Sequence, residues 1–118
     1  MDLDLTPEQE LVRDTARTFA RERVAPVAAE LDLDARFPYD LVGELAGLGF
    51  LGLPIPEEYG GAGGDTLSYA IAIEELTRVD SSVAITVAAH TSLGTMPILL
   101  FGTEEQKRAW LPDLAAGR

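Results

Sequence analysis

The sequence has 118 residues, the size of one ordinary domain, and 47% of them are hydrophobic, which excludes a disordered chain. It carries 20 acidic and 9 basic residues, and the formal net charge of −11 opposes binding to nucleic acid or to anionic membranes. The absence of cysteine excludes disulfides and thiolate metal sites. The acidic start MDLDLTPEQE lacks signal-peptide features, and we count no apolar run of ~18 residues, so we expect a soluble, cytoplasmic domain without a membrane span.

Two helix starts are predicted from capping boxes. Thr6 and Gln9 have the capping-box spacing, and Pro7 fits the first helical position, where its missing N–H costs nothing. Apolar residues then repeat every three or four positions, as on one face of a helix. Thr103 and Gln106 repeat the spacing near the C-terminus and predict the start of the last helix.

Prolines and a glycine divide the segment that follows the first helix. Pro26 is expected to kink or restart that helix. Pro38 opens a second helix, which Gly49 is expected to end, because glycine readily adopts the left-handed conformation that closes helices. The next segment, FLGLPIP at residues 50–56, is predicted to be an extended connector rather than a strand, because no partner strand is evident.

Four glycines lie within PEEYGGAGGD, residues 56–65, and glycine-rich turns often bind phosphate. A Walker-type loop needs a lysine after its last glycine, and Asp65 stands there instead. Glu57 and Glu58 would repel an anion, and the helical context denies the loop the strand of a dinucleotide fold. We therefore interpret it as a surface turn in which glycines supply positive φ angles.

Two further helices are predicted in the C-terminal half. LSYAIAIEELTRVD, residues 67–80, has a wide apolar surface and is expected to be deeply buried. VAITVAAHTSLGTMPILLFG, residues 83–102, is apolar nearly all round, which is typical of a central helix, with interruptions at Gly94 and Pro97. Together with the other helices, and without a convincing strand pair, they predict an all-α fold, an antiparallel helical bundle.

The polar residues offer few chemical candidates. His90 is the only histidine, and neither a metal-ligand spacing nor a serine nucleophile motif surrounds it, so we interpret it as a packed helix residue. Glu74 and Glu75 are interpreted as surface partners of Arg78.

The helix at residues 83–93 has a less common pattern. Ile85, Ala89 and Leu93 lie at four-residue spacing on one face, with Thr86 beside them. Such residues pack against a neighbouring helix or line a slot for an alkyl chain, and the local pattern leaves both interpretations open.

Four longer segments occur in order from about Leu5 to Gly117: LTPEQELVRDTARTFARERVAPVAAELD, FPYDLVGELAGLGFLGLPIPEEYGGAGGD, AIAIEELTRVDSSVA and HTSLGTMPILLFGTEEQKRAWLPDLAAG. In this combination the chain resembles the N-terminal helical domain of acyl-CoA dehydrogenases. The resemblance implies that residues 1–118 are this domain of an FAD-dependent oxidoreductase, which converts acyl-CoA to trans-2-enoyl-CoA. It also implies that the middle β-barrel and C-terminal helical domains are absent from this chain.

The resemblance implies a substrate-facing wall and no catalytic residue in this chain. The family's glutamate base and most of its flavin contacts belong to the two other domains, so the 118 residues alone are expected to be inactive and to bind neither FAD nor a metal. The full-length enzyme is expected to use acyl-CoA, FAD and electron-transfer flavoprotein and to form a homo-oligomer. The implied acyl-pocket wall consists of Ile85, Thr86, Ala89, Leu93, Met96 and Pro97.

Two alternatives stay open at this point. One is a stand-alone helical protein-interaction module, because a domain of this type would expose an apolar patch that favours association. The other is the first domain of a related acyl-CoA oxidase, flavin monooxygenase or carrier-protein-linked dehydrogenase.

Overall fold

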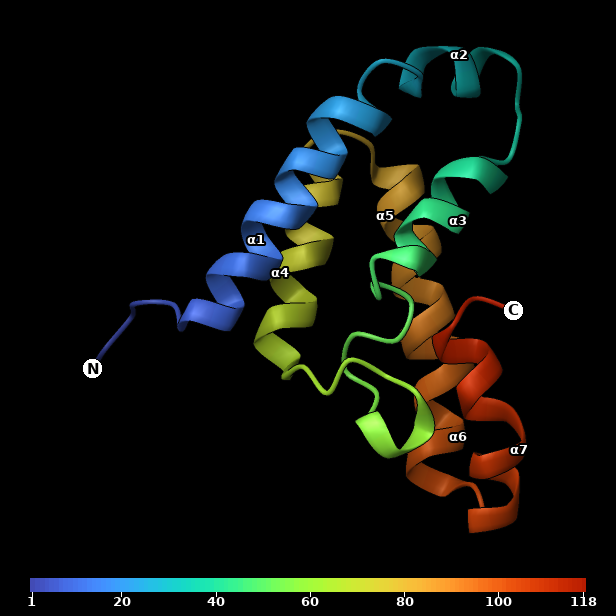
Figure 1. Cartoon of the computed structure of the whole chain (residues 1–118). Helices are drawn as coiled ribbons and strands as arrows, with labels where there is room; N and C mark the ends of the chain where they lie inside the picture. The colour runs from blue at the N-terminus through green and yellow to red at the C-terminus, as the bar shows by residue number, and fades with distance from the viewer.

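The computed structural model describes all 118 residues, and it consists of helices and turns with no strand. The all-α prediction is therefore confirmed. The molecule is flat, 42 × 40 × 19 Å, with the α1–α4 pair on one side and the α6–α7 pair on the other (Figure 1). The α-helices are α1 (Pro7–Phe19), α2 (Ala28–Leu33), α3 (Tyr39–Gly47), α4 (Thr66–Thr77), α5 (Ser81–Ala89), α6 (Met96–Phe101) and α7 (Glu104–Ala115). The shorter elements are the π-helical turns η1 (Ala20–Val24) and η3 (His90–Thr95) and the 3-10 turn η2 (Glu57–Tyr59).

Both predicted capping boxes are confirmed. In the first, Thr6 Oγ1 accepts the backbone N–H of Gln9 at 3.2 Å, and Gln9 Oε1 accepts the N–H of Thr6 at 2.9 Å. Thr103 and Gln106 make the same two bonds at the start of α7. Pro7 occupies the first position of α1, as predicted. These helix starts are specified locally, because each cap needs only residues three apart.

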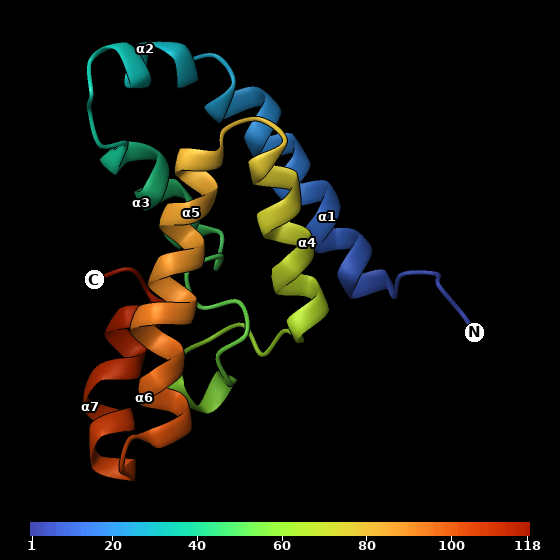
Figure 2. The same cartoon turned by 180° about the vertical axis from the view of Figure 1, so that it is seen from behind.

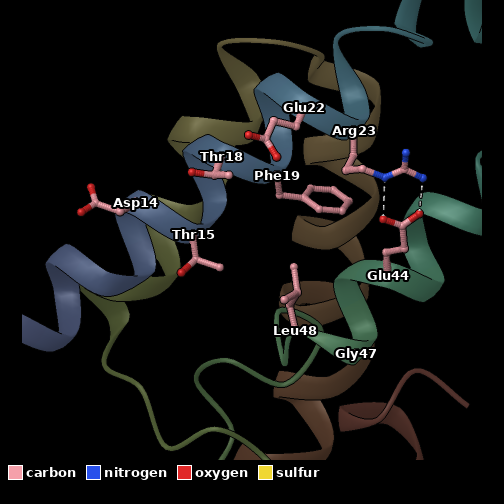
Figure 3. Close-up of a pocket in the computed structure, with 9 residues that line it drawn as sticks. All are labelled: Asp14, Thr15, Thr18, Phe19, Glu22, Arg23, Glu44, Gly47 and Leu48. Carbon is pink, nitrogen blue, oxygen red and sulfur yellow. Dashed lines mark hydrogen bonds and ion pairs between the residues drawn. The ribbon is translucent and has the colours of Figure 1, made fainter.

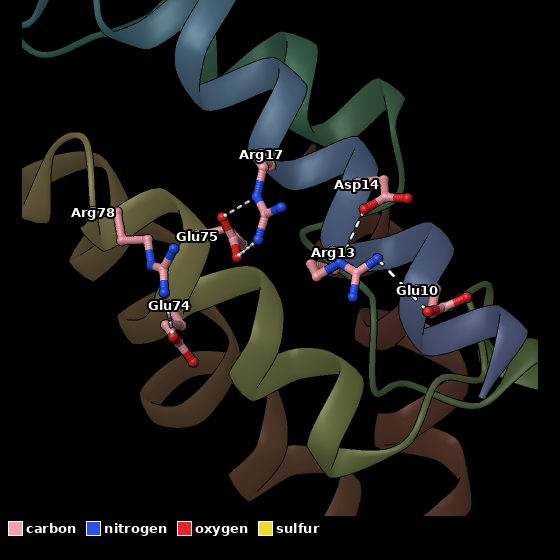
Figure 4. Close-up of polar contacts among 7 residues, drawn as sticks. All are labelled: Glu10, Arg13, Asp14, Arg17, Glu74, Glu75 and Arg78. Atoms are coloured by element: carbon pink, nitrogen blue, oxygen red, sulfur yellow. Dashed lines mark hydrogen bonds and ion pairs between the residues drawn. The ribbon is translucent and has the colours of Figure 1, made fainter. Parts of the chain in front are cut away.

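Helices α1 and α4 lie side by side and run in the same direction. Gln9 contacts Asp65 near their N-termini. Arg17 contacts Glu75 further along (Figure 4), so the paired residues occur in the same order on both helices. The next pairs, α4 with α5 and α6 with α7, run antiparallel in both views (Figures 1 and 2). The helical packing therefore combines one parallel pair with two antiparallel ones.

Glu75 is the residue whose position differs most from its interpretation as a surface partner of Arg78. Only 5% of Glu75 is exposed, and Arg17 donates two hydrogen bonds to its carboxylate, at 2.8 and 3.0 Å. Arg78 pairs with Glu74 instead, at 3.3 Å. The surface interpretation of Glu75 was wrong because α1, which is distant in sequence, covers that face of α4.

The turns predicted at Pro26 and Gly49 are confirmed. The first helix continues through η1, turns around Pro26 and restarts as α2. Helix α3 closes with Gly49 at φ 83°, the N–H of Phe50 reaching the carbonyl of Leu45 at 3.0 Å, which is a Schellman motif. Residues 50–55 form no strand, as predicted, but they make consecutive turns instead of an extended connector.

The glycine loop folds back on the connector at residues 52–55. Three backbone N–H groups of the loop donate to carbonyls of the connector at 2.8–2.9 Å: Ala62 to Gly52, Gly63 to Ile55 and Gly64 to Leu53. Gly60 and Gly63 have the predicted positive φ angles, 86° and 68°. Gly61 is required for another reason, because a Cβ there would overlap the carbonyl oxygen of Ile55. The loop is glycine-rich because two segments approach closely.

Helices α5 and α6, with η3 between them, form one continuous helix from Ser81 to Phe101 (Figure 2). The predicted interruptions at Gly94 and Pro97 were wrong, because a π-helical turn takes the place of a break. With 21 residues this helix is long and apolar enough to cross a membrane, so the expectation that no apolar segment reaches this length was also wrong. Only 28% of its most apolar 18-residue window is buried, so it is not surrounded as a central helix would be.

The core has two parts. The larger cluster of 15 buried residues is built from α1, η1, α2, α3, the connector, α4 and α5. The smaller cluster joins Ile55 and Tyr59 to Leu111 and Ala115 of α7. Together they bury the inner side of the Ser81–Phe101 helix and leave its outer side exposed.

Candidate functional site

The outer side of the Ser81–Phe101 helix is an exposed apolar face. Exposed side chains stand at Ile85, Leu93 and Phe101, with exposed fractions of 63%, 77% and 85%. Ala89 is half-buried and Pro97 exposed, and they continue the same four-residue spacing. We call these five residues the outer face.

The opposite side of the same helix has its own four-residue spacing. Val83, Val87, Thr91 and Thr95 are almost completely buried. The two series are offset by two residues, so they lie on opposite sides of the helix. Four of the six predicted wall residues, Ile85, Ala89, Leu93 and Pro97, are therefore brought together on the outer face.

The other two predicted wall residues lie at its edges. Thr86 donates its hydroxyl to the carbonyl of Ser82 at 2.9 Å, so this hydroxyl is held against its own helix. Met96 is half-buried and packs against the smaller core cluster around Ile55. Met96 therefore connects the outer face to the core rather than extending the face.

Sequence reasoning missed the continuation of this surface at the α6–α7 end. Phe101 is the most exposed large apolar side chain within the helices, and Leu100 and Trp110 are also more than half exposed. The four-residue step from Pro97 to Phe101 was a signal that could have found it. A shallow groove of ≈250 Å³ lies here, lined by Pro97, Ile98, Phe101, Gly102, Gln106 and Trp110.

His90 anchors the helix to the end of α7. Its Nε2 atom lies 2.8 Å from the carbonyl oxygen of Leu114, so Nε2 carries the proton and donates. The interpretation of His90 as a packed helix residue fits this contact. No group of three His, Asp or Glu side chains lies close enough to hold a metal ion.

The glycine loop is also tied to α7. Tyr59 donates its hydroxyl to Glu104 at 2.6 Å, and Arg108 lies over the tyrosine ring, 5.6 Å from its centre. The hydrogen bond to Glu104 raises the pKa of Tyr59, because the neighbouring carboxylate disfavours a phenolate. These contacts hold η2 against α7 and so support the inner side of the Ser81–Phe101 helix.

The largest cleft, about 650 Å³, lies elsewhere, between α1 and α3 (Figure 3). Arg23 bridges it with two hydrogen bonds to Glu44, at 2.8 and 2.6 Å, and this contact lowers the pKa of Glu44. Phe19 and Leu48 supply its apolar surface, and both are shown with the other lining residues in Figure 3. The cleft is open, and its exposed lining is mostly apolar although most of its lining residues are polar types. It was not predicted.

The outer face fits an apolar group and does not fit a dinucleotide phosphate. None of its five residues carries a charge, and the helix ends nearest to it lack a glycine-rich turn. A pyrophosphate needs backbone N–H donors or basic side chains. The phosphates of a dinucleotide cofactor would therefore need groups outside the outer face, which offers apolar contacts only.

Comparison with known proteins gives a consistent result. The sequence profile described as "Acyl-CoA dehydrogenase, N-terminal domain" matches residues 6–118. A short-chain specific acyl-CoA dehydrogenase of Clostridium acetobutylicum is 50% identical over 117 residues, which are 99% of this chain and 31% of the relative.

Solved structures agree in fold as well as in sequence. Butyryl-CoA dehydrogenase of Megasphaera elsdenii matches with a TM-score of 0.93 and 42% identity, over 99% of this chain and 31% of that one. A chain from a study of the electron transferring flavoprotein of Acidaminococcus fermentans matches with a TM-score of 0.95 and 44% identity, over 99% and 31%. An acyl-CoA dehydrogenase of Bacillus anthracis, complexed with FAD, matches with a TM-score of 0.86 and 39% identity, over 97% and 19%.

The chain spans about a third of the length of the curated relatives that it matches. Within that third the agreement runs from the first capping box to the end of α7. This chain therefore belongs to the acyl-CoA dehydrogenase family and corresponds to its N-terminal helical domain.

Proposed function

We propose that these 118 residues act as the first domain of an FAD-dependent dehydrogenase that oxidises acyl-CoA thioesters to trans-2-enoyl-CoA. The observation that carries the proposal is the outer face, an exposed apolar strip on a helix whose inner side is held by the core. Its role is to form one wall of the acyl-chain pocket and to keep water away from it. Burying it against the rest of the enzyme and the acyl chain would also explain why so apolar a helix is exposed here.

This chain supplies packing and not the chemistry itself. When bound, FAD would accept the hydride from the β-carbon, and a glutamate outside these residues would remove the α-proton. In the full-length enzyme, a barrel domain and a C-terminal helical domain would hold these groups. We also propose that the full-length enzyme is a cytoplasmic homo-oligomer and that it passes electrons to electron-transfer flavoprotein. The flavoprotein named with one similar structure supports this choice of electron acceptor.

Ala89 allows a test of the pocket wall. It stands in the middle of the outer face between Ile85 and Leu93, and its small side chain leaves room for an acyl chain. In the natural gene product that contains these residues, Ala89→Phe should reduce kcat/KM for octanoyl-CoA at least about tenfold more than for butyryl-CoA. An equal loss for both substrates would contradict the assignment of this face to the acyl pocket.

The first measurement is the intact mass and visible spectrum of the natural gene product, purified from its own host. A mass well above 12.7 kDa with bound flavin supports the dehydrogenase proposal. A mass near 12.7 kDa without flavin favours the second candidate, a helical interaction module. The observation in favour of that candidate is the exposed groove formed by Phe101 and Trp110.

A further inference from the structure

The π-helical turn η3 explains why residues four positions apart stay on one side of this helix. In an α-helix of 3.6 residues per turn, a step of four residues rotates the side chain by about 40° around the axis. From Ile85 to Pro97 this rotation would reach about 120°, which would carry Pro97 away from the face. A π-helical turn, bonded to the fifth preceding residue, has more residues per turn than an α-helix and so rotates each four-residue step in the opposite direction. The four-residue spacing therefore stays on one face because η3 replaces α-helical bonding with π-helical bonding inside a continuous helix.

The hydrogen bonds around η3 show how the turn is held. The backbone N–H of Met96 donates to the carbonyl of Thr91, five residues earlier, and not to that of Ser92. The next residue, Pro97, has no N–H, and in a regular α-helix its ring would press on the carbonyl four residues before it. The turn thus also accommodates the proline.

The side chain of Thr95 makes a hydrogen bond with the five-residue spacing of the π-helical turn. Its hydroxyl donates to the carbonyl of His90, five residues earlier, at 3.0 Å, and the residue is fully buried. The other hydroxyls with a partner on this helix, Thr86 and Ser92, each bond to the carbonyl four residues earlier. Thr95 therefore adds a second donor to the carbonyl at the first residue of the π-helical turn.

The side chain of His90 makes a second contact, which reaches outside the helix. Its Nε2 atom donates to the carbonyl of Leu114 at 2.8 Å, which ties the start of η3 to the end of α7. His90 is thus held twice: its backbone carbonyl accepts from Thr95 of the same helix, and its side chain donates to Leu114 of α7.

We propose that Thr95 and His90 are positioning residues that hold η3 and thereby set the rotational register of Leu93 and Pro97 against Ile85 and Ala89. This inference rests on the proposed function, because the register matters for an acyl chain lying along the outer face. Neither side chain touches the acyl chain. Loss of the Thr95 hydroxyl allows the helix to relax toward α-helical bonding, which rotates the second half of the face away from the first.

Thr91 offers a matched control. Like Thr95 it is fully buried on the inner side of the same helix, but its hydroxyl has no hydrogen-bond partner. Thr91→Val and Thr95→Val therefore make the same chemical change at neighbouring buried sites, and only the second removes a bond within the turn. Thr95→Ser keeps the hydroxyl and should restore the turn.

The experiment compares the natural gene product with its Thr95→Val, Thr95→Ser and Thr91→Val variants, by crystal structure and by kinetics with butyryl-CoA and octanoyl-CoA. In Thr95→Val we expect the Met96 N–H to move from the Thr91 carbonyl to that of Ser92. We also expect KM for octanoyl-CoA to rise about fivefold with kcat nearly unchanged. Thr95→Ser and Thr91→Val should keep the wild-type bond and the wild-type KM. If the Thr95→Val variant does not fold, Thr95→Ala is used in its place.

Two results would overturn the proposal: an unchanged Met96 bond in Thr95→Val, or the same KM change in Thr95→Ser and Thr95→Val. A wild-type protein without dehydrogenase activity would contradict the proposed function instead. The crystal structures alone would then decide whether Thr95 sets the register of the outer face.

Discussion

Gln9 donates a hydrogen bond from Nε2 to Oδ2 of Asp65 at 2.9 Å, and this single bond joins the N-termini of two helices. Gln9 already closes the capping box of α1, and Asp65 caps α4 by accepting the N–H of Ser68 at 2.7 Å. The Ser68 bonds, together with Gln9, lower the pKa of Asp65 because they favour the charged carboxylate. Two local helix caps thus become one tertiary contact.

Gln9→Ala should therefore cost more than an ordinary capping substitution. We expect the free energy of unfolding in urea to fall by about 1–2 kcal/mol, because both the cap and the contact with Asp65 are lost. Gln106→Ala removes the equivalent residue of the second capping box, which is exposed and whose side chain hydrogen-bonds only to Thr103, and should cost about 0.5 kcal/mol. Equal losses for the two variants would show that the Gln9–Asp65 bond contributes nothing.

The Arg17–Glu75 pair predicts a pH dependence of stability. Hydrogen bonding from Arg17 lowers the pKa of Glu75 below its unfolded value of about 4.3. This contribution to stability is therefore complete above about pH 4.3 and is lost as the pH falls through the folded pKa. In Glu75→Gln the decline of unfolding free energy between pH 5 and pH 3 should become shallower, measured by urea denaturation across that range.

Glu74→Gln is the control, because Glu74 forms an exposed pair with Arg78 on the same helix. It should leave the acid limb of the stability profile almost unchanged. A control that flattens the profile as much as Glu75→Gln would contradict the assignment to the buried pair.

Alanine substitutions should distinguish a glycine that is required by close backbone packing from one that only makes the unfolded chain more flexible. At Gly61 a Cβ would overlap the carbonyl of Ile55, so Gly61→Ala should destabilise the protein by about 3 kcal/mol or more. At Gly43, inside α3, a Cβ meets nothing within 4 Å, so Gly43→Ala should stabilise by about 0.5–1 kcal/mol. Thermal unfolding of the two variants measures both effects, and a tolerated Gly61→Ala would refute the close packing of the loop on the connector.

Ala35 is the only residue other than glycine with a positive φ angle, 49°. It follows α2, where the N–H of Arg36 reaches the carbonyl of Leu31 at 3.1 Å and closes the helix. The left-handed conformation costs a residue with a Cβ about 1 kcal/mol. Ala35→Gly should remove this cost, offset in part by the greater freedom of the unfolded chain.

We therefore expect a rise of up to about 1 kcal/mol in the free energy of unfolding, measured by urea denaturation. Ala29→Gly, within the same helix, should have the opposite sign. Destabilisation by both substitutions would contradict the strain at Ala35.

The local features of this protein could be predicted from its sequence. The capping boxes at Thr6 and Thr103, the helix stop at Gly49 and the all-α class depend on residues within a few positions of each other, so their patterns could be read directly. The four-residue spacing of Ile85, Ala89 and Leu93 also identified most of the outer face, and the order of longer segments identified the family.

Other features depend on how the helices pack and could not be read from local patterns. Glu75 is buried because a separate helix covers it, and Gly61 is glycine because the connector passes close by. The outer face at residues 85–101 depends on a π-helical turn, which the four-residue spacing alone does not reveal. Such features arise from contacts between residues 6 to 58 positions apart, from Gly61 with Ile55 to Arg17 with Glu75. They also arise from a choice of backbone hydrogen bonds that many local sequences permit. Packing selects among these arrangements, because their energies differ only once the whole core is assembled.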